Sequence, residues 1–253
     1  MTVKAFTKSN NTELDYYQQR CELACAFRWA ARHDFHESVA NHFSLAVSDD
    51  GSEFLINPNG KHFTRVTASN LLLLDANDPD TMKRPDAPDP SAWGLHGSLH
   101  RNVPHARCIL HVHSTYATVL ASLEDSLMQP IDQNTARFYN RVVVDEGFGG
   151  MAFQEEGERI CKLLEHKRIM MMGNHGLMIT APSVAQAYDE MYYFERAAKN
   201  YIKALMTRKP MRILSDEIAE KTAQQWENYK NGPENHFSEL MAILDETEAD
   251  FRN

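Results

Sequence analysis

Apolar residues in this chain follow two different periods, and each period predicts its own kind of element. Where they recur at intervals of three and four they form one face of a helix, and Ser183 with Gln186 three residues later is typical of a helix start. Apolar runs bounded by turn residues predict strands instead. Helices are expected over residues 13–32, 91–100, 115–121, 155–165, 183–205, 217–230 and 237–248. Strands are expected over residues 43–47, 54–56, 106–113, 141–144, 168–172 and 177–180. This interleaving of helices and strands indicates an α/β fold.

The segment from residue 75 to residue 90 interrupts this pattern. Proline and aspartate crowd it, and such a composition can hold neither a helix nor a central strand. We therefore expect a long surface loop there.

Composition narrows the classes of protein that this chain can belong to. Hydrophobic residues make up 43% of it, enough for a sizeable core, and the formal net charge is −9 with no cluster of Lys and Arg among aromatic residues. Nucleic acid and membrane surfaces are therefore not expected as partners. Residues 1–14 lack the apolar stretch of a signal peptide, and no run is long enough to span a membrane, so the expected location is the cytoplasm. The four cysteines, with Cys21 and Cys25 on one helix face, are expected to be buried thiols.

Three histidines have the spacing of a metal site. Alternate residues of a strand share a face, so His111 and His113 project to the same side about 7 Å apart. His175 lies between Gly173-Asn174 and Gly176, in a turn that can expose its side chain. Three neutral imidazoles with an open fourth position are typical of a catalytic metal site. Zinc is the first expectation, with Mn²⁺, Co²⁺ and Fe²⁺ as alternatives. The other histidines His33, His36, His42 and His62 are expected on the surface or in loops.

Several segments together resemble the class II aldolase/adducin family. The resemblance rests on residues 91–100 (SAWGLHGSLH), 104–114 (PHARCILHVHS), 174–176 (NHG), 40–44 (ANHFS) and 58–60 (PNG), and extends from about residue 21 to residue 206. It implies one three-layer α/β/α domain over residues 13–206 with a central, mainly antiparallel sheet, followed by a helical extension over residues 207–253. It also implies a homotetramer with active sites at subunit interfaces. His111, His113 and His175 match the zinc ligands of the family one by one.

The sequence departs from the sugar-phosphate aldolases of that family at three positions. Ala92 stands where those enzymes carry the glutamate that serves as acid and base, and Ala40 and Asn59 replace a glycine and a serine of their phosphate-binding loops. A substrate with a carboxylate or an aromatic group therefore fits better than a sugar phosphate. Replacement proton carriers are sought among His96, His100, Tyr139 and Tyr116, of which Tyr139 lies in the segment that reaches a neighbouring subunit's site in the family. Substrate-binding residues are sought at Asn41, Asn59, Gly60 and Ser91.

Three hypotheses about function follow. The first is a metal-dependent carbon–carbon lyase that performs aldol cleavage or decarboxylation on a small hydroxy-carbonyl or carboxylate substrate. Decarboxylation forms its carbanion by loss of carbon dioxide, so it can dispense with the base that Ala92 lacks. The second is a metal-dependent oxygenase on the same fold, and the third is a non-catalytic, adducin-like binding protein.

Overall fold

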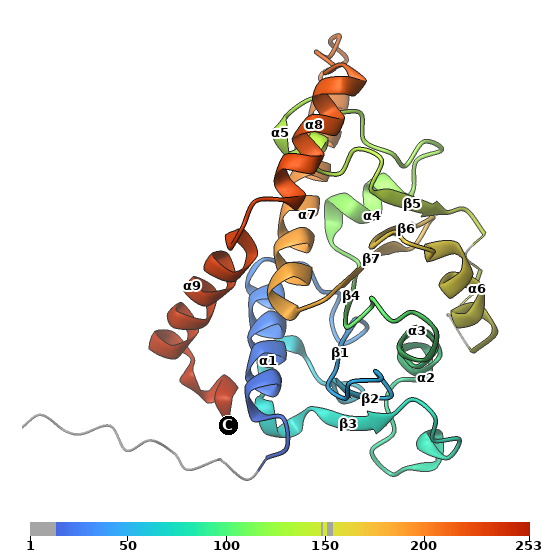
Figure 1. The fold of residues 1–253 in the computed structure, drawn as a ribbon, viewed down its shortest axis with the longest axis vertical. Coiled ribbons are helices and arrows are strands. Elements are labelled where there is room, and N and C mark those ends of the chain that lie inside the picture. Colours follow the sequence, from blue (N-terminus) through green and yellow to red (C-terminus); the bar gives the residue numbers. More distant parts are fainter. Residues whose placement is uncertain (1–13, 148, 151–153) are drawn as a thin grey trace, which may run out of the picture.

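A sheet in the order β3-β2-β1-β4-β7-β6-β5 runs through the computed structural model, which describes residues 14–147, 149–150 and 154–253 (Figure 1). Within those residues the only parallel pair is β5 with β6, and all other neighbours are antiparallel. The strands are β1 (His42–Ala46), β2 (Glu53–Ile56), β3 (Leu72–Asp75), β4 (Cys108–Val112), β5 (Val142–Asp145), β6 (Ile169–Met172) and β7 (Gly176–Ala181). The expected central, mainly antiparallel sheet is therefore confirmed.

Helices cover both faces of this sheet (Figure 1). They are α1 (Tyr17–Arg32), α2 (Pro90–Ala92), α3 (Ser98–Asn102), α4 (Thr115–Ala121), α5 (Gln133–Arg137), α6 (Gln154–Leu164), α7 (Val184–Met206), α8 (Asp216–Glu227) and α9 (Gly232–Thr247). Leu110 and Val112 of β4 pack with α1, α4 and α7 on one face, whereas Ile109 packs with α3 and α6 on the other. Because both faces are covered, the three-layer α/β/α class predicted from the sequence is confirmed.

The long helix α7 begins as its sequence predicts. The side-chain oxygen of Ser183 accepts a hydrogen bond from the backbone N–H of Gln186 at 3.2 Å and so satisfies one of the free donors at the helix start. Beyond α7, α8 packs against α5, and α9 lies on α7 and α1. Trp29 of α1 donates its indole N–H to the carbonyl of Leu240 in α9 at 2.9 Å. The division of the chain at residue 206 stays a prediction, since α9 contributes to the core that α1 and α7 share.

The structure contains elements that were not predicted, among them helix α5 and strand β3, and it interrupts one predicted helix. Strand β3 was not expected, and its last residue, Asp75, occupies the start of the segment predicted to be a loop. The expected helix over residues 91–100 is interrupted by a five-residue π-helix, η4 (Trp93–Gly97), between α2 and α3. Helix α6 packs closely on η4 because Gly157 has no side chain, and a Cβ atom there would collide with the carbonyl of Gly94.

Other expectations concern the cysteines and the chain's surroundings. Cys21, Cys25 and Cys108 are buried free thiols as predicted, and Cys161 is a partly buried one. None of the helices in the described part of the chain is long and apolar enough to cross a membrane. The expected cytoplasmic location rests mainly on residues 1–13, which lie outside the described residues.

Candidate metal centre

Three histidines converge at one end of the sheet. His111 is the fourth residue of β4, His113 follows the end of that strand, and His175 lies in the turn between β6 and β7. One side-chain nitrogen from each lies within 4.8 Å of the other two. Gly176 allows this approach, because a Cβ atom there would lie 2.6 Å from the carbonyl oxygen of Val112 and 2.9 Å from Cδ2 of His113.

Hydrogen bonds orient the rings of His111 and His113. Nδ1 of His111 donates to the carbonyl oxygen of Leu177 at 3.1 Å, and Nδ1 of His113 lies 2.5 Å from Oε2 of Glu37. With both Nδ1 atoms protonated, the two Nε2 atoms face each other with their lone pairs at 3.0 Å. Two lone pairs at this distance require a proton or a cation between them. Two ligands of a tetrahedral zinc ion lie about 3.3 Å apart, given bonds of about 2.0 Å, so these residues fit a divalent ion.

Burial keeps the imidazoles of His111 and His175 neutral, which is the form that binds metals. Removal from water lowers the pKa of His111 well below its ordinary value and lowers the pKa of His175 to about 4, with the neighbouring histidines adding to both effects. Both rings are therefore neutral near pH 7 and have a lone pair available. The Glu37 carboxylate beside His113 is the kind of partner that fixes the orientation of a ligating histidine.

A chain of buried polar side chains extends from His111 under the layer of α3 and η4. His42 pairs with His111 across β1 and β4, and their ring centroids are 5.0 Å apart. Nδ1 of His42 lies 2.7 Å from Nε2 of His96, and Oγ of Ser44 lies 2.5 Å from Nδ1 of His96 and 2.8 Å from Nε2 of His100. All four side chains in this network (His42, His96, Ser44 and His100) are buried.

The expectation that His42 is a surface residue is therefore wrong, because both faces of β1 are covered. His33, His36 and His62 lie in turns or loops as expected. His96 and His100, predicted as proton carriers, lie beyond His42 as seen from the three converging histidines. Their role as proton carriers stays a prediction.

The predicted substrate-binding residues lie at or near the same end of the sheet. Asn41 precedes β1, and its Oδ1 accepts from the backbone N–H of Glu37 at 2.6 Å. Asn59 and Gly60 are exposed in the turn that follows β2. Ser91, in α2, donates its hydroxyl to Oδ1 of Asp89 at 2.5 Å.

The two predicted tyrosines lie in different parts of the fold. Tyr139 lies just before β5, at the opposite end of the sheet, where Asp216 of α8 raises the pKa of its hydroxyl. Only a second copy of the chain could bring Tyr139 to a histidine cluster, and this stays a prediction. Tyr116 follows the histidine strand and donates its backbone N–H to Glu195 at 2.9 Å.

Two carboxylates near the centre were missed from the sequence. Glu37 binds His113, and Asp89 caps α2 by accepting from the backbone N–H of Ser91 at 2.9 Å. Asp89 is also close enough to His42 to counteract part of the burial that lowers the pKa of His42 to about 3. The Asp-Pro-Ser sequence at 89–91 signals a helix start, but no signal in it pointed to the histidines.

Fold and site together define an α/β/α protein with a three-histidine centre at one end of a mainly antiparallel sheet. The chain belongs to the class II aldolase and adducin family, because the family model described as "Class II Aldolase and Adducin N-terminal domain" matches residues 21–202. The resemblance read from the sequence is thereby confirmed.

Proteins similar to this chain carry names that point to different functions. An adducin-related protein of Schizosaccharomyces pombe is 27% identical over 92% of this chain and 76% of its own length. The decarboxylase NovR of Streptomyces niveus is 23% identical over 82% of this chain and 79% of its own. The crystal structure of an aldolase II superfamily protein from Pseudomonas syringae superposes with a TM-score of 0.84, at 26% identity, over 96% of this chain and 98% of that one.

Proposed function

We propose that this protein is a divalent-metal-dependent carbon–carbon lyase that acts on a small hydroxy-carbonyl or carboxylate substrate. The observation that carries the proposal is the convergence of His111, His113 and His175, with the Nδ1 atoms of the first two already engaged. Three protein ligands leave a coordination position for substrate, as in catalytic metal sites. Membership of a family that includes aldolases, and similarity to a decarboxylase, support a lyase-type reaction.

The residues around the centre can be assigned roles in such a reaction. A divalent ion held by the three histidines would supply a Lewis acid that stabilises negative charge on a substrate oxygen when the carbon–carbon bond breaks. Glu37 holds the ring of His113 in the orientation that its Nε2 needs. Asn41, Asn59 and Gly60 lie where β1 begins and β2 ends, beside the centre, and we propose that these loops bind the substrate.

Proton transfer is the step for which this chain must differ from the sugar-phosphate aldolases. Ala92 provides no carboxylate, and Glu37 is engaged by His113. Asp89, one helical turn before Ala92 and close to His42, is the carboxylate that we propose as proton donor to the carbanion. Decarboxylation needs only this protonation, whereas aldol cleavage also needs a base for the hydroxyl proton, so decarboxylation is the reaction that we favour.

Further properties belong to the same proposal. Zinc is the ion that three imidazoles favour first, with Mn²⁺, Co²⁺ and Fe²⁺ as alternatives. We propose a homotetramer in the cytoplasm, with Tyr139 of one subunit contributing to the site of another. The alternative is a non-catalytic, adducin-like protein, which the similarity to an adducin-related protein supports.

The test compares the wild type with the double variant His111→Ala, His113→Ala and with the control His166→Ala, an exposed histidine at the other end of the sheet. Elemental analysis of tag-free protein after incubation with each divalent ion should give near-stoichiometric metal in the wild type and the control and none in the double variant. Release of carbon dioxide from hydroxy-keto and aromatic acids should follow the same order and should fall in Asp89→Asn. A wild type that takes up no ion would refute the lyase and leave the adducin-like alternative. Cleavage to an aldehyde, without carbon dioxide, would identify an aldolase.

A further inference from the structure

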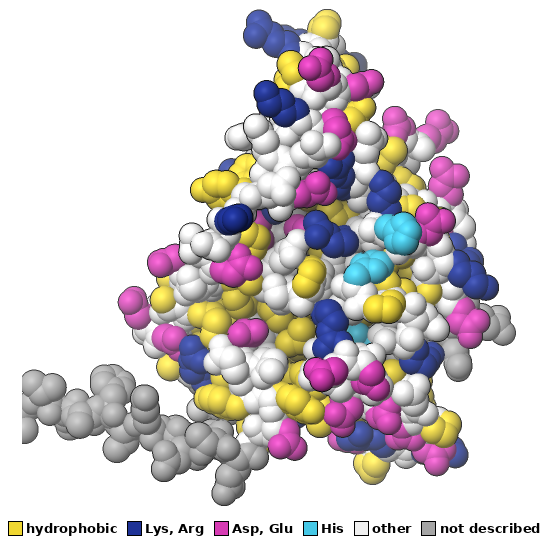
Figure 2. Space-filling view, viewed as in Figure 1, with side chains coloured by type: hydrophobic (Ala, Val, Ile, Leu, Met, Phe, Trp, Pro, Cys, Tyr) yellow, Lys and Arg dark blue, Asp and Glu magenta, His cyan; other side chains and the backbone are white. Residues whose placement is uncertain are grey.

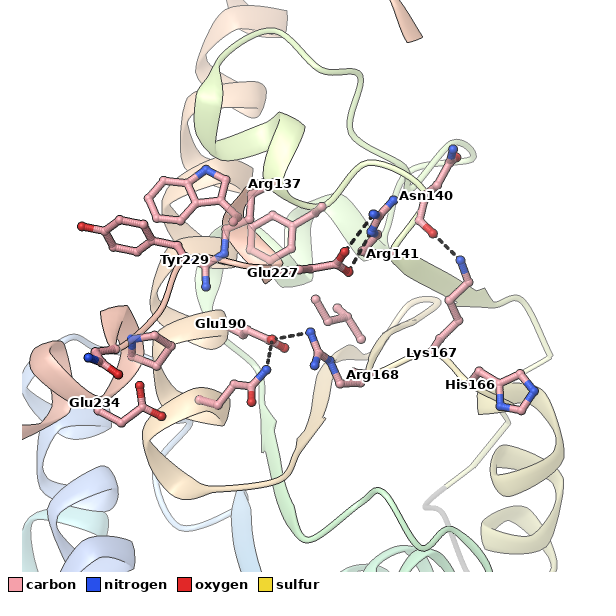
Figure 3. A pocket seen from close by; sticks show the side chains of 16 residues that line it. Arg137, Asn140, Arg141, His166, Lys167, Arg168, Glu190, Glu227, Tyr229 and Glu234 are labelled. Carbon is pink, nitrogen blue, oxygen red and sulfur yellow. Dashed lines mark hydrogen bonds and ion pairs between the residues drawn. The ribbon is translucent and has the colours of Figure 1, made fainter. Parts of the chain in front are cut away.

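A cavity lies at the opposite end of the sheet from the three converging histidines. Its volume is about 640 Å³, within the range of about 300–1,000 Å³ that small-molecule sites occupy. It is formed where β5 and β6 begin, between α5, α7, α8 and the connection from α8 to α9 (Figure 3). Basic, acidic and histidine side chains are exposed together on this face of the molecule, beside and below α8 (Figure 2). None of the residues discussed so far as metal ligands lines this cavity.

One wall of the cavity holds a buried arginine with an unused donor. The guanidinium of Arg137 lies 4.7 Å from the ring centroid of Tyr193 and 5.0 Å from that of Trp226, and its Nη2 donates to Oδ2 of Asp189 at 2.6 Å. Its side chain is only 10% exposed. Nη1 of Arg137 is buried, and no described residue accepts a hydrogen bond from it.

The wall formed by α7 holds a buried carboxylate with an unused acceptor (Figure 3). Oε1 of Glu190 accepts from Nη2 of Arg168 at 2.9 Å and from Nε2 of Gln186 at 3.1 Å. Oε2 of Glu190 is buried and, among the described residues, has no donor, although the side chain is only 5% exposed. Buried polar atoms nearly always have a partner, so an unused donor and an unused acceptor among the residues that line one cavity point to a missing partner. Both atoms are covered in this structure, so a ligand in the cavity would reach them after a small rotation of the Arg137 and Glu190 side chains.

Several other charged side chains of the cavity already have partners. Arg141 binds Glu220 and, in bidentate fashion, Glu227, and the Lys167 ammonium donates to the carbonyl of Asn140. Among the buried side-chain atoms of the described residues that line the cavity, Nη1 of Arg137 and Oε2 of Glu190 are the two without a partner. Rings of Phe138, Trp226 and Tyr229 add apolar surface to the same cavity.

We propose that this cavity is a second binding site, which takes a small carboxylic acid that also carries a hydroxyl or an ammonium group. The carboxylate would accept from Nη1 of Arg137, because a guanidinium and a carboxylate form strong, charge-assisted hydrogen bonds. The hydroxyl or ammonium would donate to Oε2 of Glu190. The site would bind hydroxy acids or amino acids with an apolar side chain, at the opposite end of the sheet from the histidine centre of the same subunit.

Three probes with one carbon skeleton test both contacts: 3-phenyllactate, phenylalanine and 3-phenylpropionate, which differ only in carrying a hydroxyl, an ammonium or neither. Titration calorimetry of the full chain should give one saturable site for at least one of the first two. Binding of 3-phenylpropionate should be weaker by about tenfold or more. A hydroxyl preference would identify hydroxy acids as the natural class, and an ammonium preference would identify amino acids.

Variants locate the binding. Glu190→Gln replaces the spare acceptor by a donor of the same shape, and Arg137→Lys keeps the charge near Asp189 but removes the spare guanidinium nitrogen. Each should weaken binding by about tenfold or more. Glu239→Gln makes the same chemical change at an exposed residue of α9 outside the cavity and should leave binding unchanged, as should the double variant His111→Ala, His113→Ala.

Two results would overturn the proposal. The first is no binding of any probe to the wild type at up to about 10 mM, which would leave water as the partner of both buried atoms. The second is binding that survives Glu190→Gln and Arg137→Lys, or that disappears only in the double histidine variant. Circular dichroism of each variant separates loss of binding from loss of folding, and Glu190→Gln alone decides the case if Arg137→Lys does not fold.

Discussion

Replacing Ser44 by alanine should destabilise the folded protein strongly, because it breaks the buried network at its middle. The Ser44 hydroxyl is fully buried and lies 2.5 Å from Nδ1 of His96 and 2.8 Å from Nε2 of His100. Alanine would leave both nitrogens without this partner. Each buried polar atom that loses its partner costs about 1–3 kcal/mol, so the free energy of unfolding should fall by about 2–6 kcal/mol.

This loss is large compared with the total stability of a typical domain, which is about 5–15 kcal/mol. For a chain of this size each kcal/mol lowers the melting temperature by about 2–4 °C. Urea unfolding, followed by circular dichroism, measures the difference. The matched control is Ser122→Ala, since that exposed hydroxyl donates only to the carbonyl of Thr118, and its loss should cost under about 0.5 kcal/mol. A loss below about 1 kcal/mol in Ser44→Ala would mean that the imidazole nitrogens find other partners and that the network is not sealed from water.

Acid should unfold the protein, because burial lowers the pKa of His42 and of His100 to about 3. The unfolded chain binds protons that these folded imidazoles exclude, so the free energy of unfolding is highest above pH 6.5 and falls toward pH 3, by about 1.4 kcal/mol per pH unit for each histidine. Urea titrations at stepped pH measure that slope, and a flat profile between pH 6 and pH 4 would contradict it. Glu37→Gln should weaken metal binding by about 10–100-fold in chelator competition, since His113 loses its charged partner; unchanged affinity would rule out the orienting role. Gly176→Ala should also lower metal affinity, because its Cβ would lie 2.6 Å from a β4 carbonyl oxygen, and a variant that binds like the wild type would show that the turn can relax.

Periodicity predicted the elements that pack one face against the core, because their apolar residues then recur at regular intervals. The helix after Ser183 has a continuous apolar stripe and a side-chain cap, and the structure has both. Strand β3 was missed because Leu71 to Leu74 form an apolar run with no alternation, which does not distinguish a strand from a helix. The π-helix η4 could not be predicted, because its geometry depends on the close packing of α6 at Gly157.

Some residues of the metal centre could likewise be predicted from the local sequence, and others depend on contacts between distant segments. His111 and His113 could be placed together because two residues of one strand share a face. His42 could not be added to them, because its position depends on the pairing of β1 with β4, which the sequence of β1 alone does not specify. Glu37 reaches His113 from a loop, and loops carry no periodicity from which a contact could be inferred.

Position 92 shows why the carboxylate that the proposed lyase needs would have to come from elsewhere in this chain. Ala92 is 2% exposed and packs in a small apolar cluster with Phe54 and Leu74. A glutamate at that position would carry its side chain into the cluster, where an ionised carboxylate without partners is costly. The small residue thus belongs to the packing of α2 against β2 and β3.

Carboxylates near the histidines are instead supplied by the loops that precede β1 and α2. Glu37 is committed to His113, whereas Asp89 uses only Oδ1 in its hydrogen bonds to Ser91 among the described residues. In the proposed lyase, its other oxygen would give a proton to the substrate. A single proton donor is sufficient for decarboxylation but not for a reversible aldol cleavage, which needs a base and an acid at different atoms. Measuring how Asp89→Asn changes the rate of decarboxylation and the rate of aldol cleavage therefore distinguishes the two reactions.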